Sequence, residues 1–411
     1  MGSPSCGTDC DDSRTGEFRD TADNCGVCGQ ACFLTCGADL TCDEIRSLSA
    51  GDNHTCGVLR GGRIACWGAN DRGQLGDGTT TASGTPVIVP TVADATRVAA
   101  GARFTCALRA SGRVSCWGNN TDGETGSGST NATVSAPSDV LFDVGRPLLD
   151  VVDVAAGDSH ACAALSTGTV YCWGRNSNAQ VTGPPATERF IYAQPVATLT
   201  GAVSLALGRA HGCALRADGN VSCWGGNGLG QLGDGRTSHG SLCGGADCAA
   251  PVSVPGTFRV IAAGGDRTCG TDAAQMLRCW GEGVGTTPST VAGVTDVRSV
   301  AVGPSHSCVV HDSNQRVACW GRNGVGQLAT GDQGDRAAPT NTELADIDSV
   351  TVGSGVGHSC ALGSNGRVMC WGSNRDSQLG DASSSHPGCD GASFWGDCSP
   401  TPTPLARSET P

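Results

Sequence analysis

Seven Cys-Trp-Gly tripeptides recur along this chain of 411 residues, and this repeat limits the possible folds more than any other feature. Successive tryptophans are separated by 50, 56, 51, 56, 40 and 51 residues, and they are Trp67, Trp117, Trp173, Trp224, Trp280, Trp320 and Trp371. This period is near that of a four-stranded propeller blade and is longer than an ankyrin or leucine-rich unit. We therefore expect one large repeat domain whose units share a continuous core.

Every repeat contains the same order of β-forming segments. In the first repeat, a β-branched run at residues 45–51 is followed by strand-like segments at 54–59 and 63–68 and by an apolar segment at 86–89. Strand alternation puts Cys56 and Trp67 on faces that are both apolar, as a sheet packed between two others requires. The 63 glycines also suit short strands joined by tight turns. The predicted fold is an all-β, seven-bladed β-propeller over residues 44–411, preceded by a small cysteine-rich N-terminal segment or stalk at residues 1–43.

Two cysteines flank the central hairpin of every repeat. Nine residues lie between them in six repeats, and ten lie between Cys308 and Cys319 in the remaining one. Directly opposed residues of an antiparallel pair have Cα atoms about 4.5–5.5 Å apart, which a disulfide tolerates. Free buried thiols are the alternative, but so many paired cysteines are typical of proteins outside the reducing cytoplasm. We predict seven blade disulfides and two loop disulfides: Cys56–Cys66, Cys106–Cys116, Cys162–Cys172, Cys213–Cys223, Cys269–Cys279, Cys308–Cys319, Cys360–Cys370, Cys243–Cys248 and Cys389–Cys398.

The pattern Gly-x-Val-x-Cys-Trp-Gly-x-Asn, followed by Gly-Gln-Leu-Gly, resembles the repeat of the regulator of chromosome condensation family. Matching segments are residues 112–120, 219–227 with 230–233, and 366–374 with 378–380, and the resemblance covers residues 44–406. It implies a seven-bladed propeller, which is a scaffold and does not define a function. The eponymous member is a nuclear nucleotide-exchange factor that binds chromatin, and this acidic, lysine-free chain is not expected to share that activity. Its paired cysteines are more similar to those of a secreted bacterial branch, some members of which bind other extracellular proteins.

The final segment of the chain, at residues 400–406, resembles the last strand of a repeat, whereas the first repeat begins at Ile45 without such a strand. We expect this C-terminal strand to complete the blade begun by residues 45–68. Such an exchange would close the ring and remove an open sheet edge.

The charged residues exclude several function classes. All 26 basic residues are arginines, against 39 acidic residues, which gives a net charge of −13. A chain without lysine has neither a Schiff-base nor a P-loop lysine, and scattered arginines do not form the basic patch that binds nucleic acid. No apolar run is long enough to span a membrane, and we expect a secretory signal to have been removed. Catalytic motifs are also missing, so we expect neither an enzyme nor a bound cofactor.

Two sets of residues have metal-ligating chemistry. Five repeats place a histidine two positions before the first cysteine, at His54, His160, His211, His306 and His358, with Phe104 and Arg267 at the other two positions. Because one histidine per blade would be spread around the ring, we favour packing over a metal site. Part of the N-terminal segment has zinc-ligand spacing, and its cysteines are Cys6, Cys10, Cys25, Cys28, Cys32, Cys36 and Cys42. We favour a disulfide knot or stalk beside a membrane or surface anchor, with one thiol left over.

The repeat is irregular at four places, and we expect recognition to occur there. The fifth repeat lacks both the Asn and the Gly-Gln-Leu-Gly sequence after Trp280, whereas residues 184–195, 236–250 and 383–400 are insertions. A short loop beside long loops on one rim would form a groove. Two insertions carry aromatic residues of the kind that anchor partners, namely Phe190, Tyr192, Phe394 and Trp395. The alternative is ordinary loop variation, with these rings packed against the blades.

The sequence favours a monomeric, extracytoplasmic binding module, secreted or on the cell surface, that presents one propeller rim to a protein or glycan partner. One alternative is an enzyme whose site is composed from several blade loops. The other is a structural cell-surface protein. Converging acidic or histidine groups with shifted pKa values would favour the enzyme, and an exposed aromatic patch would favour binding.

Overall fold

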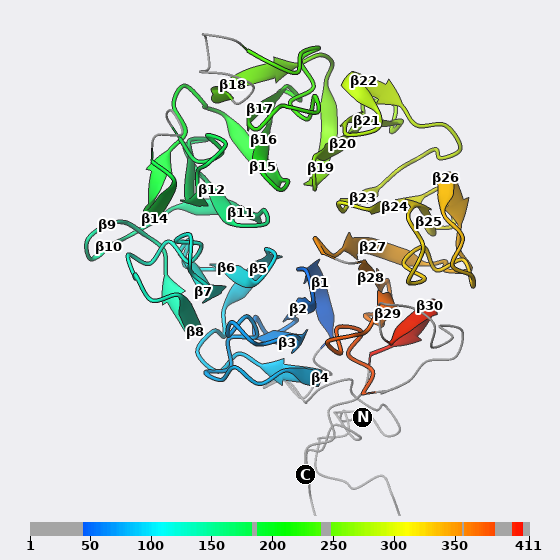
Figure 1. Ribbon diagram of the computed structural model, residues 1–411, viewed down its shortest axis with the longest axis horizontal. Helices are drawn as coiled ribbons and strands as arrows, with labels where there is room; N and C mark the ends of the chain where they lie inside the picture. Colours follow the sequence, from blue (N-terminus) through cyan, green and yellow to red (C-terminus); the bar gives the residue numbers. More distant parts are fainter. Residues whose placement is uncertain (1–43, 183–186, 240–247, 356, 383–396, 406–411) are drawn as a thin grey trace, which may run out of the picture.

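The computed structural model is a ring of seven four-stranded antiparallel sheets around a central axis (Figure 1). It describes residues 44–182, 187–239, 248–355, 357–382 and 397–405. The seven-bladed propeller predicted from the sequence is therefore confirmed, while the segment at residues 1–43, with its seven cysteines, lies outside the described residues. Among the described residues no helix is long and apolar enough to cross a membrane.

Each blade is built from one contiguous stretch of chain. Blade 1 consists of β1 (Ile45–Ala50), β2 (His54–Leu59), β3 (Ile64–Gly68) and β4 (Ser83–Ile88), in that order from the axis outward. Blades 2 to 4 are β5 (Ala95–Ala100), β6 (Phe104–Arg109), β7 (Val114–Asn119) and β8 (Thr133–Asp139); β11 (Val151–Ala156), β12 (His160–Leu165), β13 (Val170–Arg175) and β14 (Arg189–Pro195); and β15 (Ala202–Leu207), β16 (His211–Arg216), β17 (Val221–Gly225) and β18 (Cys248–Val254). A small hairpin, β9 (Leu141–Asp143) and β10 (Arg146–Pro147), follows blade 2.

Blades 5 to 7 have the same construction. Their strands are β19 (Phe258–Gly264), β20 (Arg267–Asp272), β21 (Leu277–Gly281) and β22 (Gly285–Thr290); β23 (Ser299–Val302), β24 (His306–His311), β25 (Arg316–Gly321) and β26 (Arg336–Asn341); and β27 (Ile347–Val352), β28 (His358–Gly363), β29 (Val368–Ser373) and β30 (Cys398–Pro404). Blade 5 keeps four strands although its sequence has lost the repeat's loop motif, so that loss shortens a loop without removing a strand.

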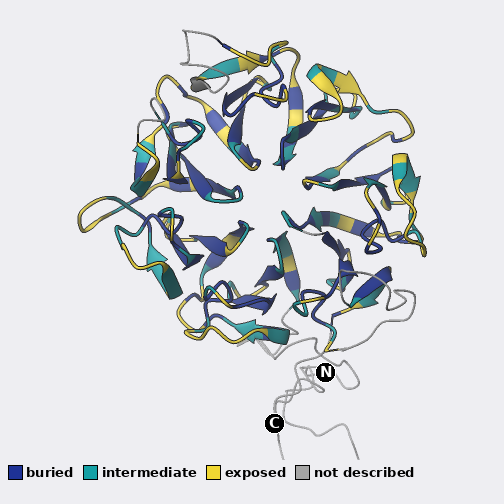
Figure 2. Ribbon diagram, in the orientation of Figure 1, coloured by how far each residue is buried: buried dark blue, intermediate teal, exposed yellow. Residues whose placement is uncertain are grey.

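The middle strands of each blade form the core. All residues of β2 and β3 are buried, whereas the outer strand β4 is mostly half-buried, and Figure 2 shows the same gradient in every blade. The cysteines pair directly across these middle strands, as in Cys56 opposite Cys66. All seven predicted blade disulfides are present, with Cα atoms 4.0–4.2 Å apart. The predicted loop pairs cannot be placed, because Cys243 and Cys389 lie outside the described residues.

The third-to-fourth connections open on one face of the ring, whereas the β9–β10 hairpin follows a fourth strand and lies at the opposite face. The connections from first to second strand and from third to fourth strand leave the sheet at the same end, and we call this end the loop face. Two of the insertions predicted from the sequence, at residues 236–250 and 383–400, fall largely in the third-to-fourth connections at residues 226–247 and 374–397. The one predicted at 184–195 is mostly strand β14, and its connection at 176–188 is no longer than residues 69–82 of blade 1. In blade 5 the same connection has only three residues, 282–284. The short connection of blade 5 thus lies next to the long one of blade 4 on one face, as the sequence predicted, whereas the prediction of a long loop in blade 3 is wrong.

The predicted exchange of the C-terminal strand is wrong. Strand β30 pairs with β29 inside blade 7, and blade 1 takes its fourth strand, β4, from residues 83–88. No strand is missing from the first repeat, because its own segment at 86–89 already fills the outer position. The ring closes instead through contacts between β1 and β2 on one side and β27 and β28 on the other.

At six of the seven blade interfaces, one main-chain carbonyl joins neighbouring blades, and we call it the acceptor carbonyl. At the interface of blades 1 and 2 it is Gln74 O, which accepts the indole Nε1–H of Trp117 at 2.9 Å and the hydroxyl of Thr105 at 3.0 Å. Six of the seven interfaces have the indole bond, at 2.8–3.0 Å; the acceptor residues are Gln74, Glu124, Gln180, Gln231, Gln327 and Gln378. The Gly-Gln-Leu-Gly sequence is therefore a turn that positions this carbonyl.

The closing interface between blades 7 and 1 uses the same contacts. Gln378 O accepts Trp67 Nε1–H at 3.0 Å and the Thr55 hydroxyl at 3.5 Å, and Thr55 also bonds His358 Nε2 at 2.9 Å. Ala50 N–H donates to the Thr351 hydroxyl at 3.2 Å. Side-chain and carbonyl hydrogen bonds therefore close the ring without a shared strand.

Thr55→Val removes one hydroxyl from this closing interface while keeping the shape of the side chain. We expect the free energy of unfolding to fall by about 1–3 kcal/mol, because the buried His358 nitrogen and Gln378 carbonyl lose a partner. Urea unfolding of the oxidised protein measures this loss. Ser307→Ala is the matched control, since the Ser307 hydroxyl occupies the equivalent place in blade 6 and has no hydrogen-bond partner. Equal losses in both variants would contradict the role given to Thr55.

Candidate functional site

A cavity lies on the loop face between blades 3, 4 and 5. Its volume is about 640 Å³. Residues from first-to-second and third-to-fourth connections meet there, and the wall includes Asp158, Arg175, Arg209, Leu229, Gln231 and Asp266. We call this cavity the loop-face pocket. Its residues are far apart in the sequence and come together because equivalent connections of neighbouring blades open on the same face.

The floor of the loop-face pocket is held by a charged network. Arg209 forms an ion pair with Asp266, which is buried, and Gln231 Nε2 donates to Asp266 Oδ1 at 3.2 Å. The Arg209 side chain itself is 60% exposed, and Leu229 is 47% exposed, so both can contact a partner. A guanidinium next to an exposed aliphatic side chain is a common composition for a protein-binding surface.

Asp158 lies where the loop-face pocket meets the central channel. Burial, together with the nearby carboxylates of Asp52 and Asp266 and against the opposing charge of Arg209, raises the pKa of its carboxyl to about 7. The pKa of Asp52 is also raised by burial, although the Ser354 hydroxyl donates a hydrogen bond to it at 2.9 Å. The junction therefore contains a carboxyl group that changes charge near neutral pH.

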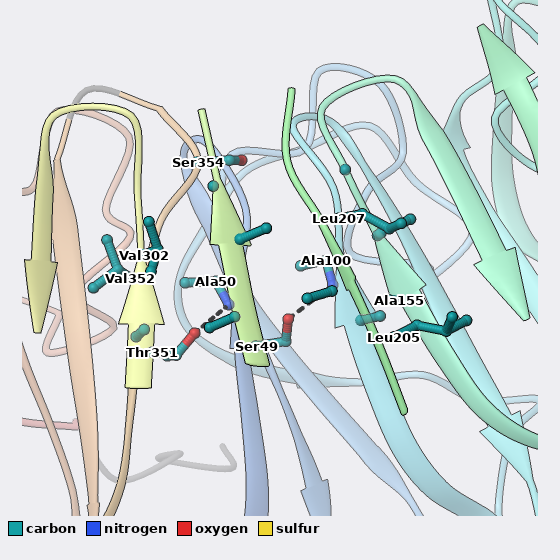
Figure 3. A pocket seen from close by; sticks show the side chains of 18 of the residues that line it. Ser49, Ala50, Ala100, Ala155, Leu205, Leu207, Val302, Thr351, Val352 and Ser354 are labelled. Carbon is teal, nitrogen blue, oxygen red and sulfur yellow. Dashed lines mark hydrogen bonds between the residues drawn. The ribbon is translucent and has the colours of Figure 1, made fainter. Parts of the chain in front are cut away.

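The central channel has a volume of about 510 Å³ and is lined by the first strands of all seven blades. Small side chains face it, and Figure 3 shows Ser49 and Thr351 bonding to the strands of neighbouring blades. Ser49 Oγ accepts Ala100 N–H at 2.9 Å, and Thr351 Oγ1 accepts Ala50 N–H at 3.2 Å. The hydroxyls that line the channel thus contribute to the blade interfaces.

Phe190 and Tyr192, the two predicted rim anchors that the structure describes, do not line the loop-face pocket. Phe190, on β14, is half-buried and packs against the core cluster of blades 3 and 4. Tyr192 is also half-buried and lies against Gly128 of blade 2. Phe394 and Trp395 lie outside the described residues.

The pocket residues themselves were not singled out from the sequence. Asp158 and Arg209 each follow the glycine that ends a first strand, a position occupied by Asp52 in blade 1 and Ala102 in blade 2. The sequence signal that could have identified these residues is the change of charge at one fixed position of an otherwise regular repeat.

The five repeat histidines lie at the blade interfaces and are fully buried. Four bond through Nε2 to a hydroxyl of the next blade at 2.7–2.9 Å, and these are His54, His211, His306 and His358. Neither ring nitrogen of His160 has a hydrogen-bond partner, because Gly212 stands where five of the blades carry a Thr or Ser hydroxyl. Among the described residues, no three His, Cys, Asp or Glu side chains are grouped as a metal site requires.

Burial lowers the pKa of all five histidines, to about 3 at His54, His211 and His306 and to about 4 at His160 and His358. The unfolded chain binds these protons near pH 6.5, before the folded ring does. Their contribution to stability is therefore complete above pH 6.5 and is lost as the pH falls towards 3–4.

Repeats of this chain match the models of a known repeat family. The model of the regulator of chromosome condensation (RCC1) repeat matches residues 45–74, 95–124, 151–180, 202–231, 297–327 and 350–378, and a second model of the same repeat matches residues 61–108 and 111–164. The chain belongs to the RCC1 repeat family. Neither model matches any part of blade 5, whose third-to-fourth connection has lost the acceptor carbonyl.

Relatives and solved structures agree with this membership. The chain is 26% identical over 376 residues to the ultraviolet-B receptor UVR8 of Arabidopsis thaliana, covering 83% of this chain and 81% of that protein. It is 32% identical over 337 residues to the human probable E3 ubiquitin-protein ligase HERC4, covering 74% of this chain but only 31% of the ligase. Crystal structures of Prp20p from Saccharomyces cerevisiae (TM-score 0.68, 22% identity, 90% of this chain and 88% of that one) and human WBSCR16 (0.70, 21%, 84% and 94%) share the fold.

Asp158→Asn removes the titrating carboxyl from the junction of this RCC1-type propeller. The raised pKa means that the folded state holds the proton more tightly, so the stability linked to Asp158 is complete below about pH 4 and is lost as the pH rises through 7. We expect the variant to be more stable than wild type at pH 8, by up to about 4 kcal/mol, and the gain to shrink towards pH 5. Urea unfolding at both pH values measures it.

Asp218→Asn is the control for this experiment. Asp218 is exposed, and hydrogen bonds from Asn220 hold the pKa of its carboxyl below the usual value. Its replacement should not stabilise the protein at pH 8. A gain from Asp218→Asn equal to that from Asp158→Asn, or a gain that does not change with pH, would contradict the shifted titration.

Proposed function

We propose that this chain is a secreted or cell-surface binding module, without catalytic activity, that holds a protein partner on its loop face. RCC1-type propellers are scaffolds for protein interaction, and the loop-face pocket is the feature that supports a binding role here. It combines a cavity of about 640 Å³ with an exposed guanidinium at Arg209 and an exposed aliphatic side chain at Leu229. Cavities lined by both apolar and charged groups are the usual sites of recognition.

The seven blade disulfides indicate an oxidising, extracytoplasmic environment. This location supports a partner that is itself extracellular or on a cell surface. The mixture of Arg175, Arg209, Asp158 and Asp266 in the pocket suits a protein surface with both charge signs. A glycan partner, the other possibility predicted from the sequence, would use the same polar groups as hydrogen-bond donors and acceptors.

One observation favours an enzyme as the second candidate. A carboxyl group with a pKa of about 7 in an open cavity, as at Asp158, has the property that a general acid or base needs. Two further observations argue against catalysis. The repeat histidines are buried in the blade interfaces, and the blade cysteines are held in disulfides, so neither set can act on a substrate in the pocket.

Leu229→Asp tests the binding face. Leu229 is 47% exposed in the loop-face pocket, and an added carboxylate there would oppose the burial of this surface by a partner. We expect affinity capture from the native extracellular fraction, with captured proteins cross-linked and identified, to lose the wild-type partner by tenfold or more, about 1.4 kcal/mol. Treatment of the fraction with protease or glycosidase before capture separates a protein partner from a glycan.

Val203→Asp is the matched control. Val203 is an aliphatic residue of the same blade with a similar exposed fraction of 49%, but it lies at the start of β15, at the end of the blade opposite the loop face. This variant should recover the partner as wild type does. Equal recovery with Leu229→Asp, or loss only with Val203→Asp, would refute binding on the loop face.

A further inference from the structure

The interface between blades 5 and 6 contains two hydrogen-bond donors that have lost their acceptor. Ser307 is fully buried, yet its hydroxyl has no hydrogen-bond partner. Trp320 lies directly opposite Ser307 in the strand register. It is half-buried, whereas the six tryptophans at the equivalent positions are fully buried. An unpaired buried hydroxyl costs free energy, so its presence needs an explanation.

Equivalent donors at other interfaces converge on one oxygen atom. In blade 5, the Thr268 hydroxyl and Trp280 Nε1–H both donate to Gln231 O, at 3.2 and 3.0 Å. In blade 7, the Ser359 hydroxyl and Trp371 Nε1–H both donate to Gln327 O, at 3.5 and 2.8 Å. The pairing of Ser307 with Trp320 therefore gives a two-donor arrangement that fits a carbonyl oxygen.

Blade 5 supplies no such carbonyl. Its third-to-fourth connection is only residues 282–284 and has no Gly-Gln-Leu-Gly turn. The histidine that would bond the Ser307 hydroxyl is replaced by Arg267, whose guanidinium donates instead to Glu282 O at 2.9–3.0 Å. Both expected partners of Ser307 are thus missing from the same interface, and the shortened connection leaves Trp320 open to the loop face.

We propose that the interface of blades 5 and 6 is a binding site for a turn of a partner protein, whose main-chain carbonyl accepts the Trp320 indole and the Ser307 hydroxyl. The occupant would replace the turn that every other interface receives from its own chain. This proposal rests on the proposed function, since it names one element of the partner that the loop face would hold. The site is separate from the loop-face pocket, whose wall includes neither Ser307 nor Trp320.

The six complete interfaces also define the shape of the turn. The last glycine of the motif lies on the indole, so that a Cβ atom added to Gly76 would be 2.6 Å from Trp117. Gly76 also has a φ of 72°, in the left-handed region that favours glycine. Four of the six turns have glycine at this position, whereas blade 3 has Thr182 and blade 6 has Ala329, so a matching partner turn favours glycine there without requiring it.

A cyclic peptide with the sequence of residues 70–78, Asn-Asp-Arg-Gly-Gln-Leu-Gly-Asp-Gly, is the probe. Added to the full-length oxidised protein, it should shift the NMR signal of the Trp320 indole in a saturable way. The other indoles should stay unchanged, with Trp320→Phe identifying the signal. Ser307→Ala should weaken the peptide about three- to tenfold, which is the effect of losing one neutral hydrogen bond. This variant is expected to fold, because the hydroxyl it removes has no partner.

Three controls keep the test specific. Ser359→Ala alters the equivalent hydroxyl at an occupied interface and should leave peptide affinity unchanged, as should Leu229→Asp in the loop-face pocket. A peptide with valine in place of its Gly76 residue should bind more weakly, because a Cβ atom at this left-handed position would lie against the indole. Absence of saturable binding, or equal affinity for Ser307→Ala and wild type, would overturn the proposal. If the peptide does not bind while partner capture depends on Leu229 as expected, only this site is overturned. If the peptide binds but Leu229→Asp captures the partner as wild type does, only the loop-face pocket is overturned.

Discussion

The stability of the ring depends on one main-chain carbonyl at each of six blade interfaces. Gln74 O and its equivalents accept an indole N–H from the next blade, and in four blades also a Thr or Ser hydroxyl. This hydrogen bond is buried, so leaving it unmade costs more than the bond itself contributes. Six repeats of the same contact allow seven separate sheets to form one ring, including the closing interface of blades 7 and 1. Blade 1 therefore needs no strand from the C-terminus.

Local features of the sequence predicted the blades, the register and the blade disulfides. Cys56 and Cys66 are close in the sequence and separated by one turn, so strand alternation alone places them opposite each other. The closing contact was predicted wrongly, because the role of Gln378 belongs to its backbone oxygen, which every residue type carries. The Gly-Gln-Leu-Gly sequence was interpreted as a turn, but the sequence did not indicate that the carbonyl of this turn accepts an indole N–H of the next blade.

The candidate site was harder to predict than the fold. Its residues, such as Asp158, Arg209 and Leu229, come from different blades and follow no linear motif. Aromatic content drew attention to Phe190 and Tyr192, which instead pack against neighbouring blades. The irregular fifth repeat was the better signal, because a missing turn leaves donors in the next blade without an acceptor. In a propeller whose interfaces repeat so closely, departures from the repeat expose groups that a partner can contact.

Hydrogen–deuterium exchange of the tryptophan indole N–H groups, followed by NMR on the oxidised protein, tests this description of the blade interfaces most directly. The six indoles bonded to an acceptor carbonyl should exchange slowly, since their release requires an interface to open. Trp320, assigned with Trp320→Phe, should exchange while those six remain protonated. If Trp320 were as protected as the others, or if several of the six exchanged as fast as it does, the acceptor carbonyl would not be what holds neighbouring blades together.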